Sequence, residues 1–260
     1  MRRAARVAVA LVLAGAGAGW GPQSLAAQPQ VTVGVQPSYF EGGFGTPGNI
    51  QIWYVPTYIR YHDGNAELKL TVPYIAVKSS GALVSGGTVV GKTGSGSSRT
   101  ESGLGDLWLE GKYTLHGRGA MPDLAPYTKI KFATASRSKG LGTGENDYEF
   151  GLEADTVIGT GLFPFGQIGY RVVGSPPNLP LRNIVTYEVG ASLRVVPGQF
   201  LTLMYSGHQS EQAGFAAASD AIAAWNYDLR PGTGFQVFGD LGLSSGSPDY
   251  GVGVGAHLRF

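Results

Sequence analysis

The sequence predicts an all-β fold, a transmembrane antiparallel β-barrel of about twelve strands. Three features of the 260 residues carry this prediction: an export-type start, side chains that alternate in character from residue 31 onward, and a last strand with one wholly apolar face. No apolar run after the start approaches the ~18 residues of a membrane-spanning helix. Strands would therefore have to make the crossing.

The N-terminus has the three parts of a secretory signal peptide. Three arginines lie among the first six residues, an apolar stretch follows over residues 7–18, and Ser24-Leu25-Ala26 is a small-residue cleavage site. A membrane anchor helix would need ~20 apolar residues, and this stretch is shorter and is interrupted by glycine. We predict a signal peptide over residues 1–26 and one barrel domain over residues 27–260.

Twelve segments behind the signal peptide alternate with a period of two and end in turn residues, which is typical of strands. Their lengths match the ~9–11 tilted residues that cross a bilayer. The segments are 31–41, 49–61, 66–77, 104–116, 126–134, 147–158, 162–173, 184–195, 200–210, 220–230, 235–243 and 250–260.

The connections between these segments alternate in length. Most even-numbered connections are tight turns of Gly, Pro, Asn or Asp, such as His62-Asp-Gly-Asn65, whereas the odd-numbered ones are mostly longer and rich in Ser, Gly and Pro. A barrel with both termini on one side of a membrane sorts its loops in this way, and a soluble sandwich has no reason to. The longest outer loop is predicted over residues 78–103.

The last strand alternates most clearly. From Tyr250 to Phe260 every even position is apolar or aromatic and every odd position is Gly, His or Arg. A chain that ends on an aromatic carboxylate after such a strand resembles the assembly signal of bacterial outer-membrane barrels, which assigns that role to Phe260. An edge strand of a soluble sandwich is the alternative.

Composition excludes several classes of function. The chain has no cysteine, which removes thiolate metal sites and cysteine nucleophiles, and its four histidines are scattered without metal-ligand spacing. Without residues 1–26 it carries 16 basic and 18 acidic side chains, a balance that gives no reason to expect nucleic-acid binding. We expect no cofactor, no metal and no enzymatic activity.

Residues 86–93 match the phosphate-binding formula G-x-x-x-x-G-K-T. In that motif a helix follows the lysine, but here a Gly/Ser run follows, which cannot start a helix. We therefore interpret the segment as part of the outer loop.

His208, Ser210 and Asn226 form a second candidate site, because they are similar to the His-x-Ser pair and downstream Asn of outer-membrane phospholipase A. His208 would act as general base and Ser210 as nucleophile. Lipid hydrolysis needs this pair on the outer wall, whereas Leu201, Leu203 and Tyr205 predict that it points inward. Those enzymes also have Asn directly after the Ser, where this chain has Glu211.

Charged side chains on the less apolar face of each strand predict a charged but balanced lumen. We expect Lys131 near Glu149, Glu149 opposite Arg171, and Arg171 level with Glu188, which would form a belt of cross-strand ion pairs. Such a belt either stiffens the wall or forms a constriction that selects solutes by charge. The inward set is Lys69, Glu110, Lys112, Lys129, Lys131, Glu149, Glu153, Asp155, Arg171, Glu188, Arg194, Asp228, Arg230, Asp240 and Arg259.

Five aromatic side chains can fall on the same inner face: Trp53, Trp108, Phe163, Phe165 and Phe238. Aromatic side chains in a lumen suit an apolar or aromatic solute. The segment that carries Trp53 is apolar on both faces, and Phe163 and Phe165 alternatively belong to an interfacial aromatic belt.

A family resemblance follows from ordered motifs. Ser102-Gly-Leu-Gly-Asp106, then Lys112-Tyr113, Lys139 to Gly144, Gly169-Tyr170 and Ser247 to Tyr250 resemble the barrels of the MetA-pathway of phenol degradation family. The resemblance covers most of the mature chain. It implies an outer-membrane barrel associated with the catabolism of aromatic compounds.

Three functions follow from this fold. The first is a passive outer-membrane channel for small hydrophobic or aromatic solutes, with loop 78–103 as a lid and the charge belt as its constriction. The others are the lipid hydrolase and a closed structural barrel. Expected partners are outer-membrane lipid, lipopolysaccharide and the barrel-assembly machinery. Asp106 lies where the long loop enters a strand. We expect it to anchor that loop by accepting hydrogen bonds from loop amides or from Lys112.

Overall fold

A computed structural model of the chain describes residues 11–13, 16–18, 29–92, 97–119 and 121–260. Most of the predicted signal peptide lies outside these residues. Within it the structure describes only β1 (Leu11–Leu13) and β2 (Ala16–Ala18), which pair antiparallel with each other. The signal peptide therefore stays a prediction.

The remaining strands form one closed antiparallel sheet and one short hairpin. The hairpin consists of β7 (Ala82–Ser85) and β8 (Thr88–Lys92), and a single 3-10 turn, η1 (Arg137–Lys139), lies in a loop. The strands of the closed sheet are β3 (Gln30–Val35), β4 (Ser38–Gly42), β5 (Ile50–Asp63), β6 (Ala66–Ser79), β9 (Arg99–Leu104), β10 (Leu107–Tyr113), β11 (Asp123–Phe132), β12 (Asp147–Asp155), β13 (Leu162–Val172), β14 (Ile184–Val196), β15 (Gln199–His208), β16 (Ala218–Arg230), β17 (Thr233–Gly242) and β18 (Tyr250–Arg259).

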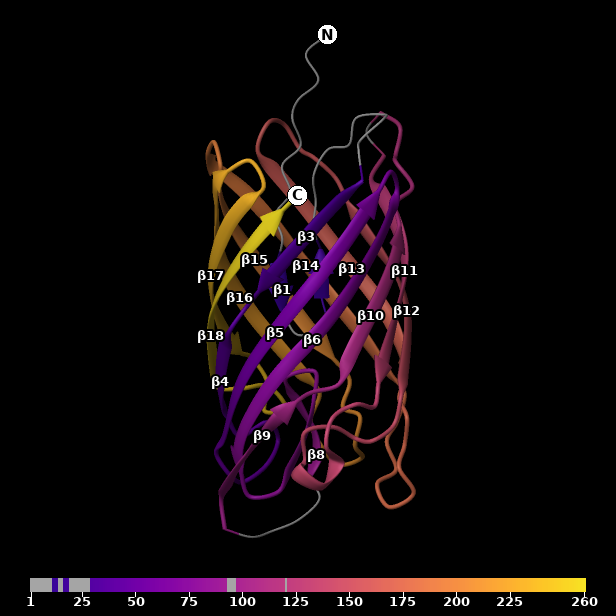
Figure 1. Ribbon diagram of the computed structural model, residues 1–260, viewed down its shortest axis with the longest axis vertical. Helices are drawn as coiled ribbons and strands as arrows, with labels where there is room; N and C mark the ends of the chain where they lie inside the picture. Colours follow the sequence, from indigo (N-terminus) through magenta and orange to yellow (C-terminus); the bar gives the residue numbers. More distant parts are fainter. Residues whose placement is uncertain (1–10, 14–15, 19–28, 93–96, 120) are drawn as a thin grey trace.

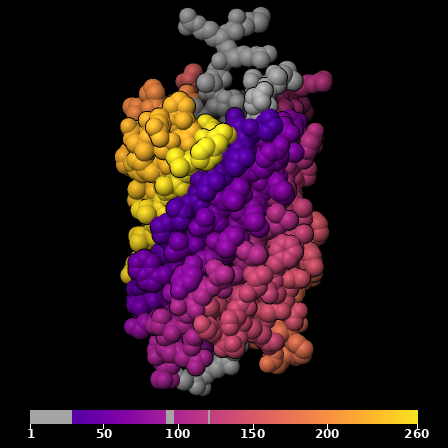
Figure 2. Space-filling view, viewed as in Figure 1, coloured from indigo at the N-terminus to yellow at the C-terminus, as the bar shows by residue number. Residues whose placement is uncertain are grey.

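The sheet is a barrel with twelve strand positions in its wall, as predicted, and each position is called a stave. β3 and β4 are two pieces of one stave, because both pair with β5 and with β18, and β9 and β10 are two pieces of another beside β6. The ring closes where β18 meets β3 and β4, which Figure 2 shows as the seam between the yellow and indigo bands. Closure leaves no unpaired strand edge, which a bilayer requires.

The predicted sorting of the loops is confirmed. The short connections, such as the two residues between Asp63 and Ala66, lie at the same end as the C-terminus of β18, and the long loops lie at the opposite end (Figure 1). Gly64 adopts a positive φ of 59° in that tight turn. At the C-terminus, the backbone of Phe260 exchanges two hydrogen bonds with Val31, and the side chain is 76% exposed.

Side chains alternate between the lumen and the outer surface along the staves. On β18, Val252 and Val254 are exposed and Gly251 and Gly253 are buried, as the sequence pattern predicts. Similar exposed aliphatic and aromatic side chains occur on every stave, so the barrel has an apolar exterior. In the described part of the chain, no helix is long and apolar enough to cross a membrane.

The stave formed by β9 and β10 is broken at Gly105 and Asp106. The Gly105 amide donates to the Pro73 carbonyl on β6 at 2.9 Å, and a Cβ at Gly105 would come within 2.6 Å of the Ile75 side chain. Only glycine fits this close approach. The break turns Asp106 into the lumen, where it is completely buried.

The outward orientation of Leu203 gives a direct test of the membrane-spanning wall. Leu203 lies in the middle of β15 and is 59% exposed, so we expect Leu203→Lys to reduce the free energy of unfolding by about 2–4 kcal/mol in lipid vesicles. Leu258→Lys, at the end of β18, is the control and should cost about 0–1 kcal/mol. Urea titration of the refolded protein measures both, and equal losses would contradict a bilayer around the wall.

Candidate functional site

The longest outer loop folds back against the inside of the barrel mouth. Its hairpin, β7 and β8, is packed so closely that all four residues of β7 are buried. The Val84 amide donates to the Gly140 carbonyl of a neighbouring loop at 2.9 Å, and the Lys131 ammonium on β11 donates to the Ser85 hydroxyl at 3.2 Å. At the hairpin turn, a Cβ on Gly87 would lie 2.9 Å from the Tyr54 ring on β5. The hairpin is therefore held by the wall and by a second loop.

The phosphate-binding formula falls on this hairpin. Gly86 and Gly87 form its turn with φ values of 58° and 85°, and β8 begins at Thr88 where the phosphate motif would have its loop. Backbone amides of a strand point sideways and do not converge as they do at a helix start. The geometry agrees with the interpretation that this segment is a structural turn.

Next to the hairpin, the outer half of the lumen is filled by a packed cluster of apolar side chains, and this region is called the apolar chamber. Aliphatic and aromatic side chains from both sides of the barrel meet there, and the hairpin contributes Ala82 and Val84. The other buried members are Phe40, Phe44, Ile50, Ile52, Tyr54, Ile75, Val77, Ala135, Leu141, Met204, Ile222, Ala224 and Phe238.

Buried ion pairs begin at the periplasmic end of the lumen. Glu67 on β6 lies 3.5 Å from the Arg60 Nε on β5 and 3.7 Å from the Lys112 Nζ on β10. Lys112 also donates to Glu153 on β12 at 3.0 Å. These four side chains connect three of the neighbouring staves to β12.

Further ion pairs continue around the wall toward the outer loops. Lys129 on β11 lies 3.5 Å from Glu110 and 3.9 Å from Glu149 on β12. Arg171 on β13 lies 2.8 Å from Glu149 and 3.4 Å from Glu211, which belongs to an outer loop. Burial raises the pKa of Glu211 to about 6, and the charge of Arg171 opposes that rise.

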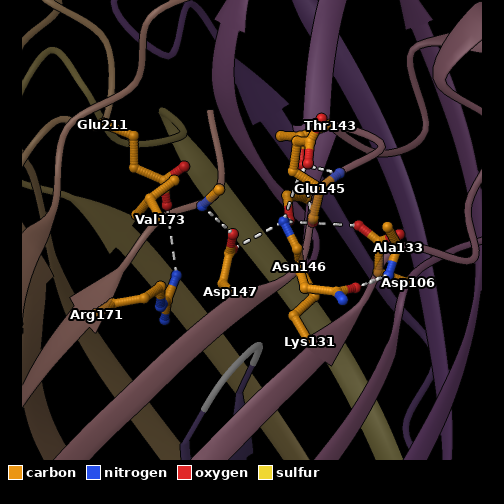
Figure 3. A network of polar contacts seen from close by, with 12 residues as sticks. Asp106, Lys131, Ala133, Thr143, Glu145, Asn146, Asp147, Arg171, Val173 and Glu211 are labelled. Carbon is orange, nitrogen blue, oxygen red and sulfur yellow. Dashed lines mark hydrogen bonds and ion pairs between the residues drawn. The ribbon is translucent and has the colours of Figure 1, made fainter. Parts of the chain in front are cut away.

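A second group of polar contacts ties the outer loops to the wall (Figure 3). Lys131 is completely buried, and its Nζ lies 2.7 Å from Asp147 and 3.9 Å from Asp106. The same ammonium donates to the hydroxyls of Ser85 on the hairpin and Thr143 on a loop, at 3.2 and 3.1 Å. One cation thus joins two loops and two carboxylates.

Asp106 contacts the neighbouring outer loop. Its Oδ1 accepts a hydrogen bond from the Ala135 amide at 3.0 Å, and a Cβ at Gly142 would lie 2.9 Å from its carboxylate. Of the two kinds of partner predicted for Asp106, the loop amide is present, whereas Lys131 takes the place of Lys112 as the nearby cation. Lys112 lies farther down β10, among the periplasmic ion pairs.

The predicted contact between Lys131 and Glu149 is wrong. β11 and β12 pair with Lys131 opposite Asp147 and Lys129 opposite Glu149, a register two residues away from the expected one. The reason is that β11 ends at Phe132, two residues before the predicted end of this segment at 134, so the two strands pair in a different register.

The predicted contact between Glu149 and Arg171 is confirmed by the register of β12 and β13. Arg171 is not level with Glu188, however. Glu188 lies opposite Gln167, whereas Arg171 lies opposite Ile184. The ion pairs therefore run diagonally over β5 to β13 and do not form a belt at one depth. Because the strands of a barrel are tilted, residues paired across neighbouring strands shift along the barrel axis from one strand to the next.

Four other predicted lumen residues are buried or half-buried. Lys69 is buried with its Nζ 5.5 Å from the Tyr58 ring, Arg194 lies over the Phe163 ring, and Glu188 is half-buried. Asp228 is half-buried at the periplasmic end.

The placement of Arg230 in the lumen is wrong. A register shift between Asp228 and Arg230 ends the alternation there, and Arg230 is exposed at the periplasmic turn, where its Nε donates to Thr233 at 3.2 Å.

A chain of neutral polar groups, which the sequence analysis missed, lines the opposite wall. Gln36 donates to Gln236 at 3.1 Å, Gln236 to Asn226 at 2.8 Å, and Asn226 to Thr202 at 3.3 Å. The Thr202 and Ser192 hydroxyls share a hydrogen bond of 2.8 Å. The sequence signal for this chain is an uncharged polar residue at an inward position of each of β14, β15, β16 and β17. The prediction of the lumen used charged residues and did not include these.

Four of the five aromatic side chains face the lumen. Trp108 lies 3.4 Å from the position a Gly86 Cβ would occupy, Phe238 is buried, and Phe163 and Phe165 contact lumen residues. The fifth assignment is wrong, because Trp53 is 56% exposed on the outer surface. Its neighbours Ile52 and Tyr54 take the inward positions.

The candidate hydrolase residues do not form a catalytic site. His208 Nδ1 contacts the Gln209 carbonyl at 2.9 Å, and the Ser210 hydroxyl donates to the Gln212 carbonyl at 2.8 Å, so neither contacts the other. Asn226 lies opposite Phe200, eight residues from His208 along β15. That separation is roughly 26 Å along a strand. Among the described residues no group of His, Asp or Glu side chains could hold a metal ion.

Comparisons with known proteins support the fold. No family model and no curated protein matches the sequence. The structure is similar to that of the COG4313 outer membrane channel from Pseudomonas putida F1, with a TM-score of 0.67 and 13% identity over 91% of this chain and 97% of that chain.

Two further solved structures are similar. The translocator domain of the autotransporter NalP from Neisseria meningitidis has a TM-score of 0.57 and 11% identity, over 90% of this chain and 89% of that chain. The NanC porin has a TM-score of 0.55 and 8% identity, over 88% and 100%. At these identities the likeness concerns the fold alone, which is that of outer-membrane barrels.

Glu149 is the most connected carboxylate of the ion-pair wall, since Tyr127 and Thr186 also donate to it at 2.9 and 3.3 Å. We expect Glu149→Gln to lower the free energy of unfolding by about 3–5 kcal/mol, because it leaves two buried cations without their shared partner. Glu101→Gln, at an exposed pair with Arg99, is the control and should cost at most about 1 kcal/mol. Equal effects in urea unfolding would show that the buried pairs do not stabilise the wall.

Proposed function

We propose that the protein is a channel of the bacterial outer membrane for passive uptake of small, hydrophobic or aromatic solutes. We also propose that it belongs with the MetA-pathway of phenol degradation family, on the strength of the motifs at Ser102–Asp106 and Lys112-Tyr113. Its similarity in fold to an outer membrane channel and a porin supports the proposal.

The apolar chamber is the observation that carries the solute class. The lumen of a water-filled pore is polar, because water solvates its lining. Here Ile52, Ile75, Val77 and Phe238 line the outer half of the lumen and are buried against the hairpin. An apolar solute would replace these contacts at little cost in desolvation, whereas a strongly hydrated one would have to lose its water.

The hairpin would act as the lid of this chamber. It joins the wall through the Ser85 hydroxyl, through the Ala82 amide, which donates to Ser79, and through packing of Ala82 and Val84. It also contacts neighbouring outer loops, where Leu83 and Val90 pack on Leu179. Asp106 would hold the neighbouring loop in place while the hairpin moves. Transport would follow the concentration gradient of the solute.

The expected partners belong to the same proposal. The exposed aliphatic band would contact outer-membrane lipid and lipopolysaccharide, and Phe260, exposed at the end of the closing strand, would be recognised by the barrel-assembly machinery.

A closed structural barrel is the second candidate, and the packing of β7 inside the mouth favours it. Conductance separates the two candidates. A channel needs a path that opens at least transiently, whereas a closed barrel stays silent when it is folded.

We expect the refolded mature protein to conduct in a planar lipid bilayer and toluene or phenol to reduce that current by occupying the chamber. Replacement of residues 82–92 by a short Gly/Ser linker should raise the conductance, because it removes the lid. Replacement of residues 243–249, an outer loop without a plug, is the control and should leave the conductance unchanged. If the folded wild type and the lidless variant are both silent, the barrel is closed and the proposal fails.

A further inference from the structure

The two sides of the lumen differ in how their charges are compensated. On β5 to β13, among the described residues, Arg60, Lys112, Lys129, Lys131 and Arg171 each lie within 4.0 Å of a carboxylate. In the outer half of β14 to β17 the inward carboxylates of the described residues have no cation within 4.0 Å. They are Glu188, Asp220 and Asp240.

Asp220 and Asp240 lie close together on the wall, and Glu188 lies between them and the ion pairs of the other side. Glu188 and Asp220 lie in one hydrogen-bonded row, since both are opposite Ser206 of β15. Asp240 lies opposite Ile222, which is the next inward residue after Asp220 on β16. The register therefore places three acidic side chains on one patch of the outer half of the lumen.

The carboxylates of this patch have few hydrogen-bond partners: Asp220 has a hydrogen bond with the Ser247 side chain, and one oxygen each of Asp220 and Asp240 is left without a partner. The Asp240 residue is 8% exposed, and its Oδ1 accepts no hydrogen bond. The Oδ1 of Asp220 is also buried and accepts no hydrogen bond. In the described part of the chain Glu188 makes neither a hydrogen bond nor an ion pair within 4.0 Å. A buried carboxylate without a partner is unfavourable, so it points to a group that arrives from the lumen.

Basic side chains of the described residues do not fill that role. The charge of Lys129 on β11 acts on Glu188, but its ammonium lies within 4.0 Å of Glu110 and Glu149 instead. Arg194 is six residues from Glu188 on β14, or roughly 20 Å along the strand, and Arg230 is exposed at the periplasmic end. His208 faces the patch from β15 but directs its Nδ1 to the Gln209 carbonyl.

The patch borders the apolar chamber directly. Phe238 is the next inward residue after Asp240 on β17, Ile222 is the cross-strand partner of Asp240, and Phe40 packs over Gly251 on the far side of Asp240. All three apolar side chains are buried. A bound molecule would thus meet carboxylates at one end and hydrocarbon at the other.

We propose that Glu188, Asp220 and Asp240 form a selectivity site for small solutes that carry a protonated amine on an apolar body. The inference rests on the proposed channel function and narrows its solute class. The ammonium group would supply charge-assisted hydrogen bonds to the unpartnered oxygens, and the apolar body would lie against Phe238, Ile222 and Phe40. The paired charges of the opposite wall would remain with their own partners.

The test measures ion selectivity and solute block on the refolded barrel. In a salt gradient across a planar bilayer, we expect the wild type to prefer cations over anions by roughly tenfold, because carboxylates concentrate counter-ions in a narrow lumen. The Asp220→Asn/Asp240→Asn double variant should reduce this ratio to near one. Asp63→Asn, which removes an exposed aspartate at a periplasmic turn outside the lumen, is the control and should keep it.

Benzylammonium, toluene and benzoate identify the solute class. We expect benzylammonium to block the wild type at roughly tenfold lower concentration than toluene, and benzoate to block most weakly. In the double variant benzylammonium and toluene should block alike. A shift in mobility of unheated protein on a gel confirms that each variant is folded.

Each outcome separates the two proposals. Conducting channels whose selectivity and block are the same in the wild type and the double variant would overturn the selectivity site and leave the channel intact. Folded barrels that are silent without the hairpin as well as with it would overturn the channel function itself.

Discussion

Backbone pairing around a closed ring is the constraint on which the rest of this structure depends. Every stave pairs on both sides, and the ring closes only because β18 meets both β3 and β4 across the break at Gln36 and Pro37. Closure fixes which face of each strand is inside. The tilt that closure requires also turns cross-strand rows into a diagonal path. The ion pairs follow this path from Glu67 to Glu211.

The lumen that results has two unlike sides. Long charged side chains on β5 to β13 neutralise one another and stiffen the wall, while β14 to β17 carry neutral amides and hydroxyls in the periplasmic half and unpaired acids in the outer half. The hairpin is attached to the compensated side, through Lys131 and Tyr54. The carboxylates in the outer half of β14 to β17 therefore face a solute in the lumen without a neighbouring cation among the described residues of the wall. This division accounts for an apolar chamber and a charged interior in one narrow barrel.

Much of the fold could be predicted because the alternation of side chains and the sorting of loops are both local signals. They located all twelve staves, and the prediction placed Glu149 beside Arg171. The failures have physical causes that no local pattern contains. Arg230 lies beyond a register shift, the partner of Lys131 depends on where β11 ends, and Trp53 lies on a strand that is apolar on both faces. The hairpin was missed because β7 is buried on both faces and lies in a segment with loop-like composition.

The central claim is that the β7–β8 hairpin is a movable lid over the chamber. The chain has no native cysteine, so a disulfide can be introduced without interference. Ser85 on the hairpin and Thr143 on a neighbouring loop lie near each other, because their hydroxyls lie 3.2 and 3.1 Å from the same Lys131 ammonium. Loss of free thiols on oxidation verifies that the introduced pair has formed a disulfide before conductance is measured. Single-channel conductance of the Ser85→Cys/Thr143→Cys protein should be low when oxidised and should rise to the wild-type value after reduction. Equal conductance in both states would contradict a lid at this position.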